Sequence, residues 1–255
     1  MQPSKNTPKR IRSRLLSAFM LMIGLAVLAA GAGYLYLYQN NTYQSLQNLS
    51  KELQFKLFDL REQERGFLLV DAKNPHSLAD GESIYLDKFQ KGQLLIKDLF
   101  TQLKRNVSAK ELGIEDNVQQ AEQVFNQYVL HFNLLSDKII QRGFKDEGLE
   151  GQMRQVAHQL ENIKGIDRVQ LLYLRRYEKD FFIRKDKEYV DKVYAVLNQL
   201  KLAYRGNPNT LNAIQEYERK FERIVSLETE IGLTESEGLK GKLQKSLQAI
   251  EQEFG

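Results

Sequence analysis

The chain contains no cysteine among its 255 residues, which excludes disulfides, c-type haem attachment and thiol catalysis. Only three histidines are present, His76, His131 and His158, and this scarcity argues against a histidine-based metal centre. Proline is also scarce, at four residues. Most apolar residues recur at spacings of three or four, and no clear strand alternation is present. The pattern therefore predicts an all-α protein.

The excess of positive charge is confined to one end of the chain. The formal net charge is +4, yet five of the 37 basic residues lie in residues 1–14, where there is no acidic residue. The remainder holds 32 basic residues against 33 acidic ones. A surface that binds phosphates needs a concentrated excess of lysine and arginine. We therefore expect no nucleic-acid partner.

A membrane anchor is predicted directly after this basic tail. Residues 15–38, "LLSAFMLMIGLAVLAAGAGYLYLY", contain no charge, and about 20 helical residues span a bilayer core. Ala30, Gly31 and Ala32 also resemble a signal-peptide cleavage site, but the apolar run is longer than a signal core of about 7–15 residues. The positive tail favours a cytoplasmic N-terminus, an inner-membrane location and an extracytoplasmic segment from residue 39 to 255.

Six helices are predicted in this segment, at about residues 39–70, 78–103, 117–141, 149–204, 211–231 and 236 to the end. The fourth would be about 80 Å long, roughly twice the others. One long helix with shorter partners is typical of two four-helix bundles stacked end to end. We expect the first helix, the second half of the fourth and the last two to form the membrane-proximal bundle. The remaining segments and the tip of the first helix form the distal one.

Two pairs of similar segments indicate an internal repeat. "LREQERGF" at 60–67 matches "LRRYEKDF" at 174–181, and "EGLEGQMRQVAHQLE" at 147–161 matches "EGLKGKLQKSLQAIE" at 237–251. The two matches occur in the same order in the chain, which is typical of a duplicated helical unit.

These segments resemble a known family. "LLYLRRYEKDFFIRKDKEYVDKV", preceded by "GLEGQMRQVAHQLE", resembles the helical bimodular sensor domain of bacterial chemoreceptors and some sensor histidine kinases. "REQERGFLLVD" resembles the first-helix signature of related extracellular four-helix sensors. The likeness covers roughly residues 40–255. It implies a homodimer that binds a small organic acid between bundle helices, partly through arginines, without a cofactor.

The sequence departs from that layout in two places. The chain stops at "AIEQEFG", within a predicted helix and before a second membrane span, so we expect it to be part of a longer protein. Gln244 stands where the other repeat has Arg154, which weakens the case for a full arginine set in the membrane-proximal bundle.

The candidate ligand-binding residues are the arginines of the repeated motif, Arg61, Arg65, Arg175 and Arg176. A guanidinium suits a carboxylate because its planar fork gives two parallel hydrogen bonds. The competing interpretation is structural: these arginines would pair with Glu64 and Glu178 and fix the register of the helices. Four arginines against two core-facing acids leave a positive surplus, which an anion site requires.

The leading hypothesis is thus a transmembrane chemoreceptor, with a histidine-kinase sensor domain as the close alternative. A membrane-anchored helical protein-interaction domain without a small ligand is the competing class. An enzyme is not expected, because the sequence shows no phosphate-binding glycine loop, nucleophile motif or paired Glu-x-x-His sites. His158 and Glu161 have helical ligand spacing, but no second such pair accompanies them, so no metal site is predicted.

Overall fold

The computed structural model describes residues 7–74, 83–106, 110 and 112–254. The described residues form helices and contain no strand, so the predicted all-α class is confirmed. In chain order the elements are α1 (Thr7–Leu69), the 3₁₀ turn η1 (Asp71–Lys73), α3 (Ile84–Arg105), α5 (Glu115–Arg142), α6 (Gly148–Glu161), α7 (Arg168–Arg184), α8 (Lys187–Ala203), α9 (Pro208–Ile231) and α10 (Gly238–Phe254).

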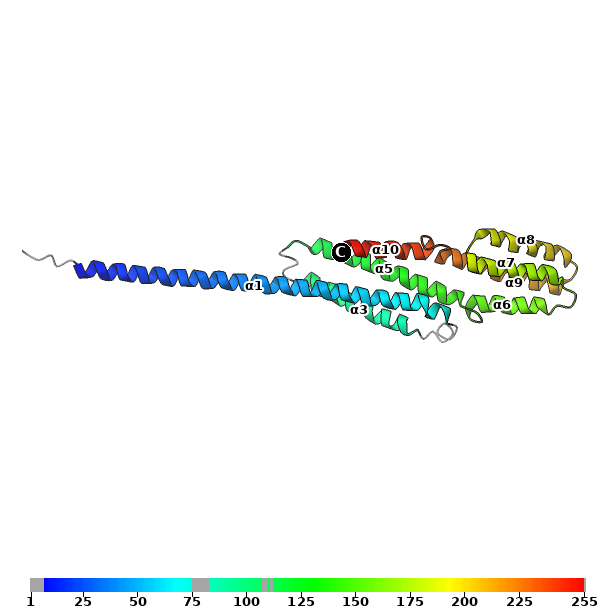
Figure 1. Ribbon diagram of the computed structural model, residues 1–255, viewed down its shortest axis with the longest axis horizontal. Coiled ribbons are helices and arrows are strands. Elements are labelled where there is room, and N and C mark those ends of the chain that lie inside the picture. The colour runs from blue at the N-terminus through cyan, green and yellow to red at the C-terminus, as the bar shows by residue number, and fades with distance from the viewer. Residues whose placement is uncertain (1–6, 75–82, 107–109, 111, 255) are drawn as a thin grey trace, which may run out of the picture.

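The longest element is α1, whose 63 residues extend about 95 Å at 1.5 Å per residue. Its N-terminal part projects away from all other described helices (Figure 1). Leu21, Leu28 and Tyr36 are at least 65% exposed, as apolar side chains in contact with lipid would be. Within the described residues, one helix is long and apolar enough to cross a membrane, and it is this one. The predicted start of the second helix, at residues 78–82, lies outside the described residues.

Two hydrophobic cores lie one after the other along the molecule. The first is formed by side chains of α1, α3, α5 and α10, and the second by side chains of α6, α7, α8 and α9. We call these the proximal and distal helix groups, because α1 leads from the predicted anchor into the first (Figure 1). The chain passes from the proximal group to the distal group between α5 and α6 and returns between α9 and α10.

The prediction of one long helix over 149–204 is wrong. Gly165 adopts a positive φ of 83°, and the Asp167 side chain then accepts hydrogen bonds from two backbone amides to start α7. Lys185 ends α7 in the left-handed conformation, and Asp186 caps α8 by accepting from the Glu188 amide. Aspartate at these two positions favours helix starts, a signal that competes with the apolar periodicity.

This error also changes the predicted partners. The sequence placed the second half of the 149–204 helix and the helix over 211–231 in the membrane-proximal bundle. Instead, these segments belong to the distal core, and α3 and α5 join α1 and α10 in the proximal one. The two breaks explain the difference, because α7 and α8 fold back on α6 and α9 instead of running past them.

The repeat has a structural counterpart in both groups. Phe67 packs edge-on against Phe132 at 5.9 Å between ring centroids, and Phe181 packs on Phe221 at 5.8 Å. The turn before α6 and the turn before α10 each begin and end with a glycine of positive φ. The third glycine of each motif is Gly151 or Gly241. A Cβ atom added there would clash with a backbone oxygen, at 2.0 Å from Gly151 and 2.1 Å from Gly241.

Candidate functional site

Each helix group contains a buried carboxylate held by a tyrosine. In the proximal group, the Tyr128 hydroxyl donates to Glu64 Oε2 at 2.7 Å. In the distal group, the Tyr217 hydroxyl donates to Glu178, which also accepts from the Arg175 guanidinium. Burial raises the pKa of both carboxyls above the ordinary value, and the tyrosine hydrogen bonds partly offset that rise. These pairs are therefore equivalent core features of the two repeats.

The first arginine of each motif forms an ion pair with the equivalent glutamate of the repeat. Arg61 Nη1 lies 2.6 Å from Glu251 Oε1, and Arg175 Nε lies 3.8 Å from Glu161 Oε1. The sequence aligned Glu161 with Glu251, so these contacts preserve the internal symmetry. The two arginines are not brought together, since Arg61 belongs to the proximal group and Arg175 to the distal group.

The other two predicted arginines lie on the outer surface. The Arg65 side chain is 68% exposed and pairs with Glu62 at 3.7 Å, one turn away on the same helix. The Arg176 side chain is 72% exposed and pairs with Asp180 at 3.9 Å. Exposed pairs of this kind contribute about 0–1 kcal/mol. Neither residue lines the main pockets of the described structure.

Arg175 lines a pocket that extends from α6 and α7 to the junction of the two helix groups. This cationic groove has a volume of about 380 Å³. Its lining includes six basic side chains and three acidic ones, together with Phe144, Phe182 and Ile183; the charged residues are Lys73, Arg142, Arg154, Arg175, Lys179, Lys185, Glu150, Glu178 and Glu228. Within the described residues, Lys73 and Lys179 form no ion pair. The groove thus combines a surplus of positive charge with apolar walls.

At the junction end of the cationic groove lies a carboxylate with two cationic partners. Glu228 is 1% exposed, and its Oε1 lies 2.6 Å from Lys185 Nζ and 3.3 Å from Arg142 Nη1. Burial lowers the pKa of Lys185, while the Glu228 carboxylate opposes this effect. Burial raises the pKa of nearby Glu150. Because Arg142 ends α5 and Glu228 lies on α9, this ion cluster connects the proximal group to the distal group.

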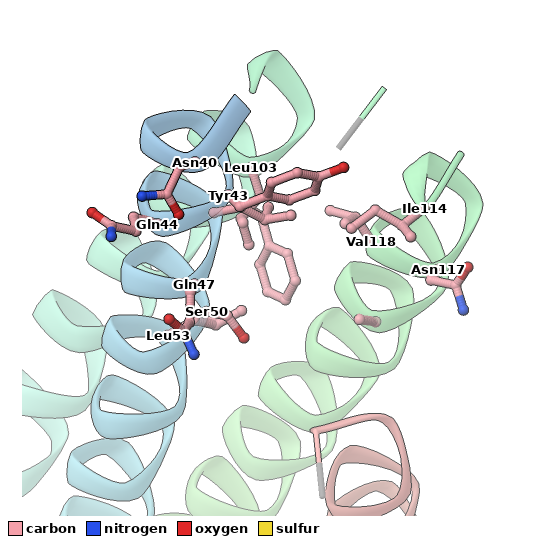
Figure 2. A pocket seen from close by; sticks show the side chains of 13 residues that line it. Asn40, Tyr43, Gln44, Gln47, Ser50, Leu53, Leu103, Ile114, Asn117 and Val118 are labelled. Carbon is pink, nitrogen blue, oxygen red and sulfur yellow. The ribbon is translucent and has the colours of Figure 1, made fainter. Parts of the chain in front are cut away.

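A larger pocket, of about 740 Å³, has a different character. It lies between α1, α3 and α5 beside the predicted anchor (Figure 2). Asn40, Gln44, Gln47 and Asn117 supply amides, and its described lining residues include no charged side chain.

The sequence did not indicate Arg142, Lys185 or Glu228 as site residues. Arg142 precedes a helix-ending glycine, and Lys185 occupies a helix break that the apolar periodicity concealed. Arg154 and His158 lie one turn apart on α6 but have different surroundings. Arg154 lines the groove, whereas His158 forms a hydrogen bond with Glu161 on the surface. Two aspartates that cap helices were the local signal for the break next to Lys185.

Comparisons with protein families, with characterised proteins and with solved structures find no match for this chain. The functional argument therefore rests on the residues of the cationic groove.

Proposed function

We propose that this chain is the extracytoplasmic sensor region of a transmembrane chemoreceptor and that it binds a small organic acid in the cationic groove. The observation that carries the proposal is the surplus of six basic over three acidic side chains in a pocket with apolar walls. Such a lining neutralises a carboxylate and shields its carbon skeleton from water. The proposal includes the helical bimodular architecture, in which the proximal and distal groups are two stacked four-helix bundles.

The energetics are sufficient for a metabolite. A micromolar dissociation constant corresponds to about −8 kcal/mol. Charge-assisted hydrogen bonds contribute roughly 1.5–3 kcal/mol each, so three or four from groove side chains reach this value before ordering costs. The groove contains enough donors: Lys179 is exposed, and Arg154 and Arg175 are partly exposed, although Arg154 also pairs with Asp146 at 2.9 Å.

The position of the groove supports a signalling role. Its lining combines Arg142 at the end of α5 with residues of α6, α7 and α9, so a ligand there contacts both helix groups. A ligand shifts a conformational equilibrium only if it binds one arrangement better than another. A small movement at the junction would change the packing of α5 against α10 and α1, and α1 continues into the predicted anchor. We also propose that the receptor is a homodimer whose two N-termini lie in the cytoplasm.

The test is a thermal-shift screen of the full chain in nanodiscs against small organic acids, amines and amino acids, followed by calorimetry. Ligand at 100 times its dissociation constant adds about 2.7 kcal/mol of stability, which raises the melting temperature measurably. Arg154→Ala should weaken a carboxylate hit at least tenfold. Arg176→Ala is the matched control, since this arginine lies on the surface outside the groove, and it should change the affinity less than twofold.

Either of two results would reject the proposal. One is a screen without any acid that binds. The other is a hit that Arg176→Ala abolishes and Arg154→Ala leaves intact, because it would place the ligand on the outer face of α7.

A protein-interaction domain is the second candidate, and a different observation favours it. Val169 and Leu172 are 60% and 71% exposed on α7 and lie outside the cationic groove, and apolar side chains of this size would contact a partner protein. Substitution of both by serine should abolish association with such a partner and leave acid binding unchanged. A histidine-kinase sensor would share the same ligand site and differ only in the signalling part.

A further inference from the structure

We infer that Glu228 is a built-in counter-anion of the cationic groove, which an entering carboxylate displaces from Lys185 and Arg142. This inference rests on the proposed function, since it concerns the regulation of the same site. Glu228 bonds Lys185 at 2.6 Å and Arg142 at 3.3 Å, and all three side chains line the groove. The protein's own carboxylate thus occupies the place that the carboxylate of a ligand requires.

The arrangement is suited to displacement. Both cations contact the same oxygen of Glu228, Oε1. The Lys185 side chain remains 24% exposed and that of Arg142 18%, so a ligand in the groove can reach both. A buried carboxylate without its cations is costly, however, and the ligand has to supply the difference through its other contacts. Glu228 therefore lowers the affinity for every simple carboxylate and selects ligands that make further bonds, for example to Arg154 or Lys179.

Displacement also connects binding to the junction. Arg142 belongs to the proximal group, whereas Glu228 and Lys185 belong to the distal one. When a ligand takes over Arg142, one of two ion pairs between the described residues of α5 and α9 is lost, and the pair of Lys138 with Glu230 remains. The free energy of ligand binding and the strength of the junction are then linked.

The probe for this inference is propionate, CH₃–CH₂–COO⁻, because it has the same carbon atoms and charge as the glutamate side chain. Propionamide, which has the same shape without the charge, is the control ligand. Binding to the full chain in nanodiscs is measured by calorimetry and by the melting temperature at fixed ionic strength. Glu228→Gln should lower the dissociation constant for propionate at least tenfold relative to the unchanged chain, and propionamide should have no effect.

Two further variants sharpen the test. Glu228→Ala removes a CH₂–COO⁻ group, so acetate, which has that size and charge, should restore its melting temperature; if this variant does not fold, Glu228→Gln decides alone. Glu230→Gln removes a neighbouring carboxylate of α9 that pairs with Lys138 on the surface at 2.6 Å, and it should bind propionate as the unchanged chain does.

The outcomes separate this inference from the proposed function. Propionate affinities within twofold of each other in Glu228→Gln and the unchanged chain overturn the inference, even if the chain binds another organic acid. Tight propionate binding by Glu228→Gln alone supports the inference, and the acid screen of the unchanged chain decides the proposed function separately. No propionate binding by any variant overturns the inference and leaves the proposed function to that screen.

Discussion

Removing the hydroxyl of Tyr128 should destabilise the protein more than removing that of Tyr217, although the two tyrosines hold equivalent buried carboxylates. Tyr128 is the donor to Glu64, and within the described residues Glu64 has no other hydrogen-bond partner. Its motif arginine, Arg61, is paired with Glu251 instead. By contrast, loss of the Tyr217 hydroxyl leaves Glu178 bonded to its arginine.

The expected magnitudes follow from this difference. A hydrogen bond to a charged group contributes about 1.5–3 kcal/mol, and a buried charge left without a donor is at the upper end. We expect Tyr128→Phe to cost about 2–3 kcal/mol and Tyr217→Phe about 1–1.5 kcal/mol. In a chain of this size, 1 kcal/mol lowers the melting temperature by about 2–4 °C. Tyr128→Phe should thus melt about 4–12 °C below the unchanged protein, and Tyr217→Phe about 2–6 °C below it.

The pH dependence of the cost has a defined sign. Burial raises the pKa of Glu64, so the folded protein binds this proton more tightly than the unfolded chain. Stability associated with this group is fully present below the unfolded pKa and is lost as the pH rises through the folded pKa. Tyr128→Phe removes a hydrogen bond that lowers the pKa, so the folded pKa rises further. The cost of the substitution should therefore shrink when the pH falls from about 8 to about 5.

The assay is thermal and urea unfolding of the full chain in nanodiscs at both pH values. Far-ultraviolet circular dichroism monitors the loss of helix. Equal costs for the two tyrosine variants would refute the argument that the arginine distinguishes the two sites. A Tyr128→Phe cost that does not change with pH would refute the assignment of Glu64 as its charged partner.

Three further outcomes test the local structure and the topology. Gly241→Ala should lower the melting temperature, because its Cβ would lie 2.1 Å from a backbone oxygen, whereas Gly206→Ala, with open space around it, should not; equal melting temperatures would contradict the close approach. Lys145 has a φ of 57°, so Lys145→Gly should be about 1 kcal/mol more stable than Lys145→Ala in urea unfolding, and the opposite order would rule out the left-handed conformation. In this cysteine-free chain, Ser226→Cys should react with an impermeant maleimide in intact spheroplasts and Ser4→Cys only after lysis, and the reverse pattern would invert the topology.

The sequence predicts the fold class and the anchor because both depend on composition over many residues. An uncharged run over 15–38 needs no knowledge of partners, and apolar spacing of three and four identifies helices directly. Helix partners are harder, since they depend on where the chain reverses. A single αL residue, Lys185, followed by the cap Asp186, separates α7 from α8 and reassigns both to the distal group. The apolar spacing is judged over many residues and does not reveal a break of one or two residues. The prediction of one long helix was therefore wrong.

In the candidate site, too, contacts within one helix are easier to predict from the sequence than contacts between helices. Arg175 pairs with buried Glu178, because helical spacing fixes which side chains share a face, whereas Arg61 pairs with exposed Glu251 of α10 and not with Glu64. The sequence left two roles for them, and the structure places both in internal ion pairs, with Arg175 also facing the groove. Glu228 could not be inferred, since its partners come from two other helices and meet only after those helices have packed.

The repeats differ at the positions that give the groove its charge. Lys185 stands where the other copy has Asp71, and Glu228 stands where it has the buried, apolar Ile139. Partly exposed Lys185 and buried Glu228 offset each other's desolvation cost, and the equivalent proximal positions carry no such pair. On the proposed function, ligand chemistry is therefore confined to the cationic groove, at the junction and along the distal group.

On the proposed function, a signal from the distal group has few routes towards the membrane. Within the described residues, the chain crosses between the groups at two turns, 143–148 and 232–238. Both turns are tight, since a side chain at Gly143 or Gly232 would lie 2.0 or 2.2 Å from a carbonyl oxygen of the same turn. On the proposed function, we expect turns packed this closely to pass a movement of α6 or α9 on to α5 and α10. The ion pairs of Arg142 with Glu228 and of Lys138 with Glu230 join α5 to α9 and hold the two helix groups together at rest.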